Sequence, residues 1–147
     1  MTLVRNRILL IFLGVILLTM TGCSKQISGI KNADYAVVSF TIDPAAETYK
    51  FEGDDVEKII SLIKPETWRK GRLTLELSPV EHIYFNQNDT RYVVGILDVE
   101  NNDVMFKVKS ATNGKWNSDS CYYKTDDVGY KELMLCIEGN VYHRGIT

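Results

Sequence analysis

The chain has 147 residues, of which 45% are hydrophobic, and its formal net charge at pH 7 is −2. This length fits one domain with a substantial core. The slightly acidic balance argues against a nucleic-acid-binding protein and against a polybasic membrane-binding surface.

Residues 1–22 have the layout of an export signal. Arg5 and Arg7 give a positive start, residues 8–18 form an unbroken apolar run, and small residues follow. A positive start, about 7–15 apolar residues and a small-residue end are typical of a secretory signal peptide. The apolar run is shorter than the roughly 20 residues of a spanning helix. We therefore expect residues 1–22 to be removed after export.

The cleavage region carries a second signature. Met20-Thr21-Gly22-Cys23 resembles a lipobox, the motif of bacterial lipoprotein precursors. The resemblance implies that Cys23 becomes the N-terminus and carries a diacylglycerol and fatty acyl chains such as palmitate. Ser24 then favours the outer membrane, facing the periplasm, in an organism with two membranes, and otherwise the outer face of the cell membrane. The alternatives are an ordinary secreted protein or an uncleaved anchor.

Residues 23–34 are predicted to be a lipidated tether, because they are polar and show no periodicity. A globular domain at residues 35–147 follows. It opens with alternating residues at 35–43, which predict a half-buried strand, and with a short second strand at 48–51.

One helix is expected at residues 54–64. Asp54 and Glu57 suit the first turn of a helix as a capping pair, and Pro65 favours an end at Lys64. Its apolar residues recur at helical spacing and predict one buried face: Val56, Ile59, Ile60 and Ile63. Trp68, just past the helix, is expected in the core.

Period-two alternation then predicts strands at residues 72–77, 82–87, 91–99, 104–109, 120–125 and 130–138, before a short segment at 141–144. Thr112-Asn113-Gly114 is a strong turn signal. The expected fold class is α+β, with one short helix in the N-terminal half packed on a curved antiparallel sheet of about five to seven strands.

The cysteines follow from the proposed anchor. Lipidation of Cys23 would leave Cys121 and Cys136 as a pair in an exported domain, which predicts a disulfide. On neighbouring strands, such a bridge would add about 3 kcal/mol of stability. The alternative is two free thiols in a reducing compartment.

No catalytic or metal-binding motif is present. The two histidines, His82 and His143, lack metal-ligand spacing, and no nucleophile or phosphate-binding loop matches a known pattern. We therefore expect neither a cofactor nor a metal, and the sequence favours a protein without enzymatic activity.

Aromatic residues crowd into the last third of the chain. Trp116, Tyr122, Tyr123 and Tyr130 form a possible contact surface, and Tyr142 follows them. Tyr122 and Tyr123 are consecutive, so they must face opposite sides of a strand. The alternative is that these residues simply reflect the aromatic preference of strands.

The sequence favours a membrane-anchored envelope lipoprotein with a binding or interaction domain. Its partners would be the membrane, through the N-terminal lipid, and an envelope protein or glycan, but not nucleic acid. Two alternatives remain: an inhibitor or immunity-type lipoprotein directed against an envelope-attacking enzyme, and a small-ligand carrier or enzyme with an unrecognised site.

Overall fold

The computed structural model describes residues 25–40, 48–73, 76–79, 81–117 and 120–142. The predicted signal peptide, Cys23 and His143 lie outside the described residues. Among the described residues, no helix is long and apolar enough to cross a membrane.

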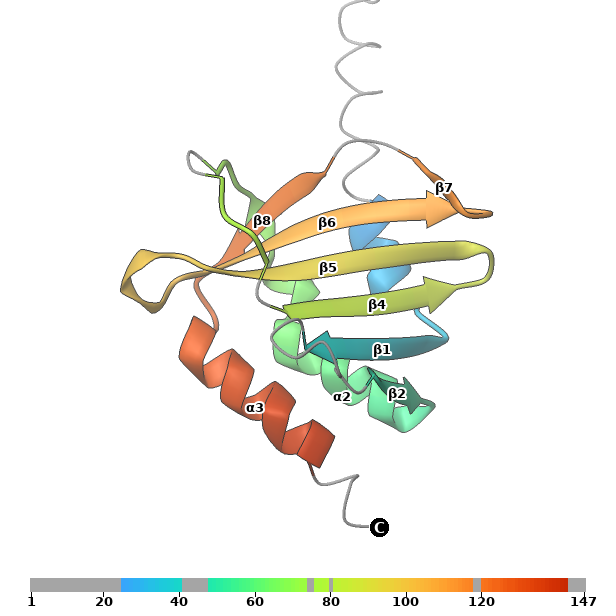
Figure 1. Ribbon diagram of the computed structural model, residues 1–147, viewed down its shortest axis with the longest axis horizontal. Helices are drawn as coiled ribbons and strands as arrows, with labels where there is room; N and C mark the ends of the chain where they lie inside the picture. The colour runs from blue at the N-terminus through green and yellow to red at the C-terminus, as the bar shows by residue number, and fades with distance from the viewer. Residues whose placement is uncertain (1–24, 41–47, 74–75, 80, 118–119, 143–147) are drawn as a thin grey trace, which may run out of the picture.

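The fold is α+β, as predicted, with helices packed on an antiparallel sheet (Figure 1). Eight strands are found in the described part of the chain, in the spatial order β2-β1-β4-β5-β6-β8-β3, with β7 paired to β6. Their bounds are β1 (Tyr35–Phe40), β2 (Thr48–Glu52), β3 (Arg69–Lys70), β4 (Glu81–Gln87), β5 (Thr90–Asp98), β6 (Val104–Thr112), β7 (Lys115–Trp116) and β8 (Cys121–Thr125).

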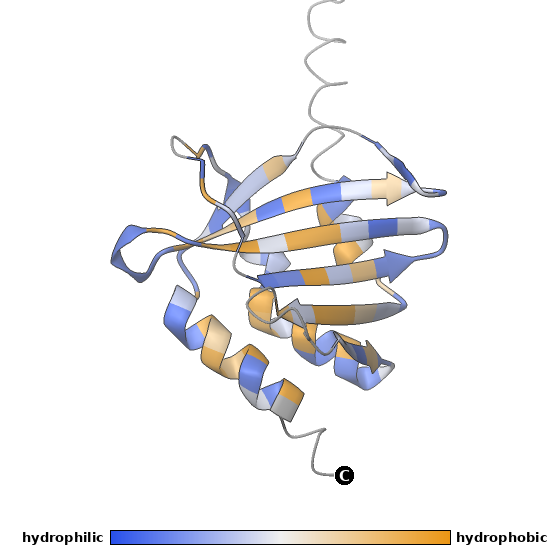
Figure 2. Ribbon diagram, viewed as in Figure 1, coloured by the Kyte–Doolittle hydropathy of each residue, from blue (hydrophilic) through white to orange (hydrophobic). Residues whose placement is uncertain are grey.

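The pattern of the central strands decides which face of the sheet is covered. In β6, Phe106 and Val108 are fully buried, whereas Lys107 and Lys109 point to the other side. Burial alternates in the same way along the first five residues of β4, and Figure 2 shows orange and pale segments following one another on that strand. Because side chains alternate along a strand, one face of the sheet forms the core, and the opposite face is partly exposed, although Leu97 and Met105 are buried on it.

The helix α2 (Asp54–Ile63) covers the core face with the predicted apolar side chains, and Val56, Ile59 and Ile63 are buried. Its start differs from the prediction, because Gly53 is the N-cap, with a φ of 57°, and no side chain caps the first turn. The acidic residues there still favour the positive end of the helix dipole. The helix ends at Lys64, as its place before Pro65 predicted, and Lys64 is the C-cap in the left-handed conformation.

Trp68 is a core residue, as predicted. It follows the 3-10 turn η1 (Pro65–Thr67), and its ring stacks on Phe106 with centroids 4.4 Å apart. The indole Nε1 donates a hydrogen bond of 2.7 Å to the Ile63 carbonyl. The end of α2 is therefore fixed to the sheet by a buried ring whose polar atom has a partner.

The strand predicted at residues 130–138 is wrong, because this segment belongs to the helix α3 (Tyr130–Tyr142). Its buried residues Leu133, Ile137 and Val141 recur every four positions, which is the spacing of one helix face. Met134 widens that face. The helix α3 contacts α2, and both lie on the core side of the sheet (Figure 1).

The predicted tether is also wrong over its described residues. Residues 25–31 are helical, and Gln26 and Ile30 are buried. The Tyr123 hydroxyl donates a hydrogen bond of 3.2 Å to Gln26 Oε1. A helix this short gains its stability from packing on the sheet, which sequence periodicity does not reveal.

The described residues of the strand predicted at 72–77, which are 72–73 and 76–77, have no regular secondary structure. The sheet order explains this difference. The strand β3 lies at one edge of the sheet and β4 lies near its middle, so the connecting chain must cross other strands. Along this crossing Pro79 packs closely against Gly95, where a Cβ would lie 2.6 Å from the proline Cγ.

Candidate functional site

The open face of the sheet, opposite the helices, is the candidate site. One row of side chains crosses it through the strand register: Lys50, Val37, Tyr84, Val93 and Lys109 lie side by side on β2, β1, β4, β5 and β6. Rows on either side of it add further aromatic and basic side chains: Tyr35, Arg91, Trp116, Lys107 and Tyr122. The face is therefore both aromatic and basic.

Two adjoining hollows lie on this face, with volumes of about 460 Å³ and 320 Å³. They share Tyr84, Val93 and Trp116 as lining residues. We call the two hollows together the open-face groove. The larger one extends over residues at the strand ends, most of them polar or aromatic: Tyr35, Asn86, Asn88, Asp89, Thr90, Arg91, Ala111 and Gly114. The smaller one extends the other way, over Pro79, His82, Gly95, Lys107 and Lys109.

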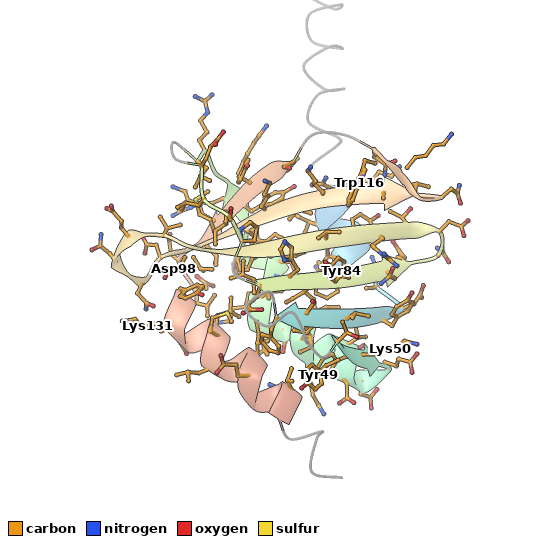
Figure 3. The ribbon with its side chains drawn as sticks, viewed as in Figure 1. Tyr49, Lys50, Tyr84, Asp98, Trp116 and Lys131 are labelled. Atoms are coloured by element: carbon orange, nitrogen blue, oxygen red, sulfur yellow. The ribbon has the colours of Figure 1, made fainter. Side chains whose placement is uncertain are left out.

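Trp116 stands at the rim of the groove with 62% of its surface exposed. The turn at Asn113 and Gly114 places it, because both residues have positive φ, of 50° and 76°, which favours a tight hairpin between β6 and β7. Figure 3 shows Tyr84 in the middle of the sheet and Trp116 near this hairpin. An exposed tryptophan beside a hollow is a common feature of binding surfaces.

Cations accompany the aromatic rings. Lys109 Nζ lies 5.7 Å from the Trp116 ring centroid, Arg91 Cζ lies 6.0 Å from that of Tyr84, and Lys107 Nζ lies 5.9 Å from that of Tyr122. These distances are at the outer limit of cation–π contact, at about 6 Å. The rings therefore interact only weakly with these charges, which remain on the open face.

Arg91 is the best-fixed of these cations. Its Nε donates a hydrogen bond of 3.1 Å to Oδ1 of Asn86, whose side chain is buried. Among the described residues, no carboxylate pairs with Arg91, Lys107 or Lys109. The groove is therefore locally positive even though the whole chain has a net charge of −2, and Asp89 is the acidic residue in its lining.

His82 lines the smaller hollow next to Tyr84, with ring centroids 6.2 Å apart. Burial lowers the pKa of His82 below its ordinary value, and the nearby charge of Lys107 lowers it further. The neutral imidazole is therefore favoured near pH 7. Within the described segments, no group of three His, Cys, Asp or Glu side chains is arranged to hold a metal ion.

The structure separates the four aromatic residues of the predicted contact surface. Trp116 and Tyr122 lie on the open face, and Tyr122 is half-buried. Tyr123 is only 2% exposed and belongs to the core. Tyr122 and Tyr123 therefore face opposite sides of the strand, as predicted. Tyr130 is half-buried at the start of α3 and packs against the core cluster, so it lies away from the open face.

The sequence interpretation missed Tyr84 and Arg91 as site residues. Alternation along β4 and β5 indicates that they face away from Phe85 and Tyr92, which are buried. The sequence therefore indicated which way each side chain faces, but it did not indicate which strands lie next to one another. Only the register of β4, β5 and β6 shows that Tyr84 lies near Lys109 and Trp116.

The predicted disulfide between Cys121 and Cys136 is not formed. Cys121 is half-buried on β8, whereas Cys136 is exposed on α3. The expected bridge required residues 130–138 to be a strand paired with its neighbour. Because this segment is a helix instead, the two sulfur atoms are not placed for a bond.

Comparisons with known proteins leave the site to be interpreted from its geometry. No protein-family model matches the chain, no curated protein matches it, and no solved structure matches it.

Proposed function

We propose that the protein is a non-enzymatic, membrane-anchored envelope lipoprotein that binds its partner through the open-face groove. The observation that carries the proposal is Trp116, which is 62% exposed beside a hollow that it shares with Tyr84. Aromatic side chains with a large exposed area are favoured at binding surfaces. The anchor is the lipid expected on Cys23, which would hold the domain at the membrane surface.

The groove suits binding better than chemistry. It is lined by aromatic, amide and cationic side chains, and its histidine favours the neutral form because burial lowers the pKa of His82. Cations fixed over a sheet face can orient a ligand of opposite charge. A binding role uses all of these features.

Recovery of partners from envelope membranes tests this proposal. The full-length protein, purified in a non-ionic detergent, is compared with Trp116→Ala and Tyr84→Ala variants. Leu135→Ala is the matched control, because Leu135 is a large apolar residue that is 70% exposed on α3. The groove variants should recover at least about 10-fold less of a specific partner, and the control should recover the same amount as the parent.

Equal recovery of every partner by all four proteins would contradict the groove as the binding site. Mass analysis of the mature N-terminus tests the anchor separately. An acylated Cys23 is expected, and an unmodified N-terminus at any other residue would contradict lipidation.

A further inference from the structure

We propose that the ligand of the open-face groove is an acidic glycan, whose sugar rings stack on Trp116 and whose carboxylate or phosphate groups pair with Arg91 and Lys109. This assignment rests on the binding function proposed above and adds the chemical class of the ligand. It follows from three properties of the groove: its charge, the fixed position of one cation, and the chemistry of its lining.

The charge of the groove selects an anion. Arg91 lines the larger hollow, and Lys107 and Lys109 line the smaller one. In the part of the chain that the structure describes, none of the three forms an ion pair with a carboxylate. By contrast, Lys50, at the edge of the same face, pairs with Glu52. The unneutralised cations therefore converge on the groove, in a protein that is acidic as a whole.

Arg91 is prepared to bind an acid group. Its Nε is occupied by Asn86, and its guanidinium lies toward the Tyr84 ring. This contact leaves the terminal nitrogens available for two parallel hydrogen bonds to a carboxylate or a phosphate. Because the buried Asn86 fixes the side chain, less conformational entropy is lost on binding.

The lining distinguishes a glycan from an acidic protein segment. A protein partner typically inserts large apolar side chains into apolar pockets. In the larger hollow, the only aliphatic side chains are Val93 and Ala111, and the rest of the lining is aromatic, glycine or polar. The side-chain amide of Asn88 suits a ligand rich in hydroxyls. The exposed Trp116 ring offers a flat apolar face to the C–H groups of a sugar ring.

Direct binding to defined oligosaccharides tests the assignment. The full-length protein in non-ionic detergent is titrated with a galacturonate hexamer and with a phosphomannan fragment of similar length. A maltose-type glucose hexamer supplies sugar rings without charge, and a glutamate hexamer supplies charge without sugar rings. Vesicles of phosphatidylglycerol supply an anionic lipid surface. Trp116→Ala and Arg91→Gln remove the two groove contacts, and Lys131→Gln removes a cation from α3 as a matched control.

At least one acidic oligosaccharide should bind, and each groove variant should weaken that binding about 10-fold. Lys131→Gln should leave it unchanged, because Lys131 is exposed on the helix side of the sheet. Affinity should fall as salt is added, since ion pairs contribute to it.

Four results would overturn the assignment. The first is that the neutral glucose hexamer binds as tightly as the acidic oligosaccharides. The second is that the glutamate hexamer binds as tightly and Trp116→Ala has no effect. The third is vesicle binding that requires Trp116 and Arg91, and the fourth is that neither acidic oligosaccharide binds. If the last result occurs while partner recovery from membranes still depends on Trp116, the glycan assignment fails and the binding function stands. If partner recovery does not depend on Trp116, the binding function fails as well.

Discussion

The hydroxyl of Tyr123 on β8 donates a hydrogen bond of 3.2 Å to Oε1 of Gln26, in the helix at residues 25–31. The contact is buried and joins residues that are 97 positions apart. It ties the start of the described chain to the core of the sheet.

Removing this hydroxyl should destabilise the protein. A Tyr123→Phe variant leaves Gln26 Oε1 buried without its donor, which costs about 1–3 kcal/mol. Urea unfolding measures the change. Tyr122→Phe is the matched control, because Tyr122 is half-buried on the opposite face, and its loss should be about 0.5 kcal/mol or less. Equal stability of the two variants would mean that the Tyr123–Gln26 contact contributes nothing to folding.

The turn that positions Trp116 should be sensitive to a side chain at Gly114. Gly114 has a φ of 76°, so Gly114→Ala should cost about 1–2 kcal/mol and disturb the β6–β7 hairpin. Ligand affinity at the groove should fall together with stability, whereas Asn113→Gly should preserve both, because glycine tolerates the φ of 50° at that position. Thermal unfolding and ligand titration measure the two effects. A Gly114→Ala protein with unchanged stability and affinity would contradict this role of the turn.

The stability of the protein should depend on pH through His82. Its pKa is lowered in the folded state, first by burial and then by Lys107, so the unfolded chain takes up a proton at a higher pH than the folded chain does. The stability that the neutral imidazole provides is therefore complete above about pH 6.5 and is lost as the pH falls from there through the lowered pKa. Urea unfolding between about pH 7.5 and pH 5 should show this loss, and His82→Gln should reduce it. An NMR titration of the His82 ring with a midpoint at or above its ordinary value would contradict the prediction.

The two thiols should differ in reactivity. Cys136 is exposed on α3 and should react quickly with a maleimide, whereas the half-buried Cys121 should react more slowly. In denaturant the two rates should become similar, which serves as the control. Mass mapping without reductant should find no peptide that links the two residues, and a linked peptide in the folded protein would restore the disulfide interpretation.

The elements that were predicted correctly from the sequence have a hydrophobic pattern that fits only one type of secondary structure. In α2, Val56, Ile59 and Ile63 recur at helical spacing, and Glu57, Lys58 and Ser61 between them are exposed. In β6, Phe106 and Val108 alternate with lysines, so only a strand buries one side. The segment at α3 differs, because apolar residues are continuous from Leu133 to Ile137 and fit either period. Its helical structure depends on packing against the sheet and α2.

The N-terminal helix was missed for a related reason. Its contacts are tertiary: Gln26 accepts from Tyr123, and Gly29 packs directly against the ring of Tyr92, where a Cβ would lie 2.1 Å from Cζ. Neither residue belongs to an apolar stripe. In the sequence, a buried glutamine and a closely packed glycine look like tether residues, because tethers also consist of polar and small residues.

The candidate site was predicted in part. Trp116 was identified because aromatic residues crowd into the last third of the chain, but its partners Tyr84 and Arg91 are separated from it by at least one strand in the chain. A surface built across several strands depends on their order. The sequence indicates which residues of a strand face the same side of the sheet. The order of the strands then determines which of these residues are neighbours.

The order of the strands also affects how the protein behaves among its own copies. An open sheet exposes unpaired backbone groups at its edges, and such edges can pair with another chain. Here the edge strands are the five-residue β2 and the two-residue β3 and β7, and all three carry exposed charged side chains: Lys50, Glu52, Arg69, Lys70 and Lys115. Short, charged edges give a neighbouring sheet little to pair with. The long central strands, which would aggregate most readily, are enclosed on both sides, so many copies can crowd together without their sheets merging.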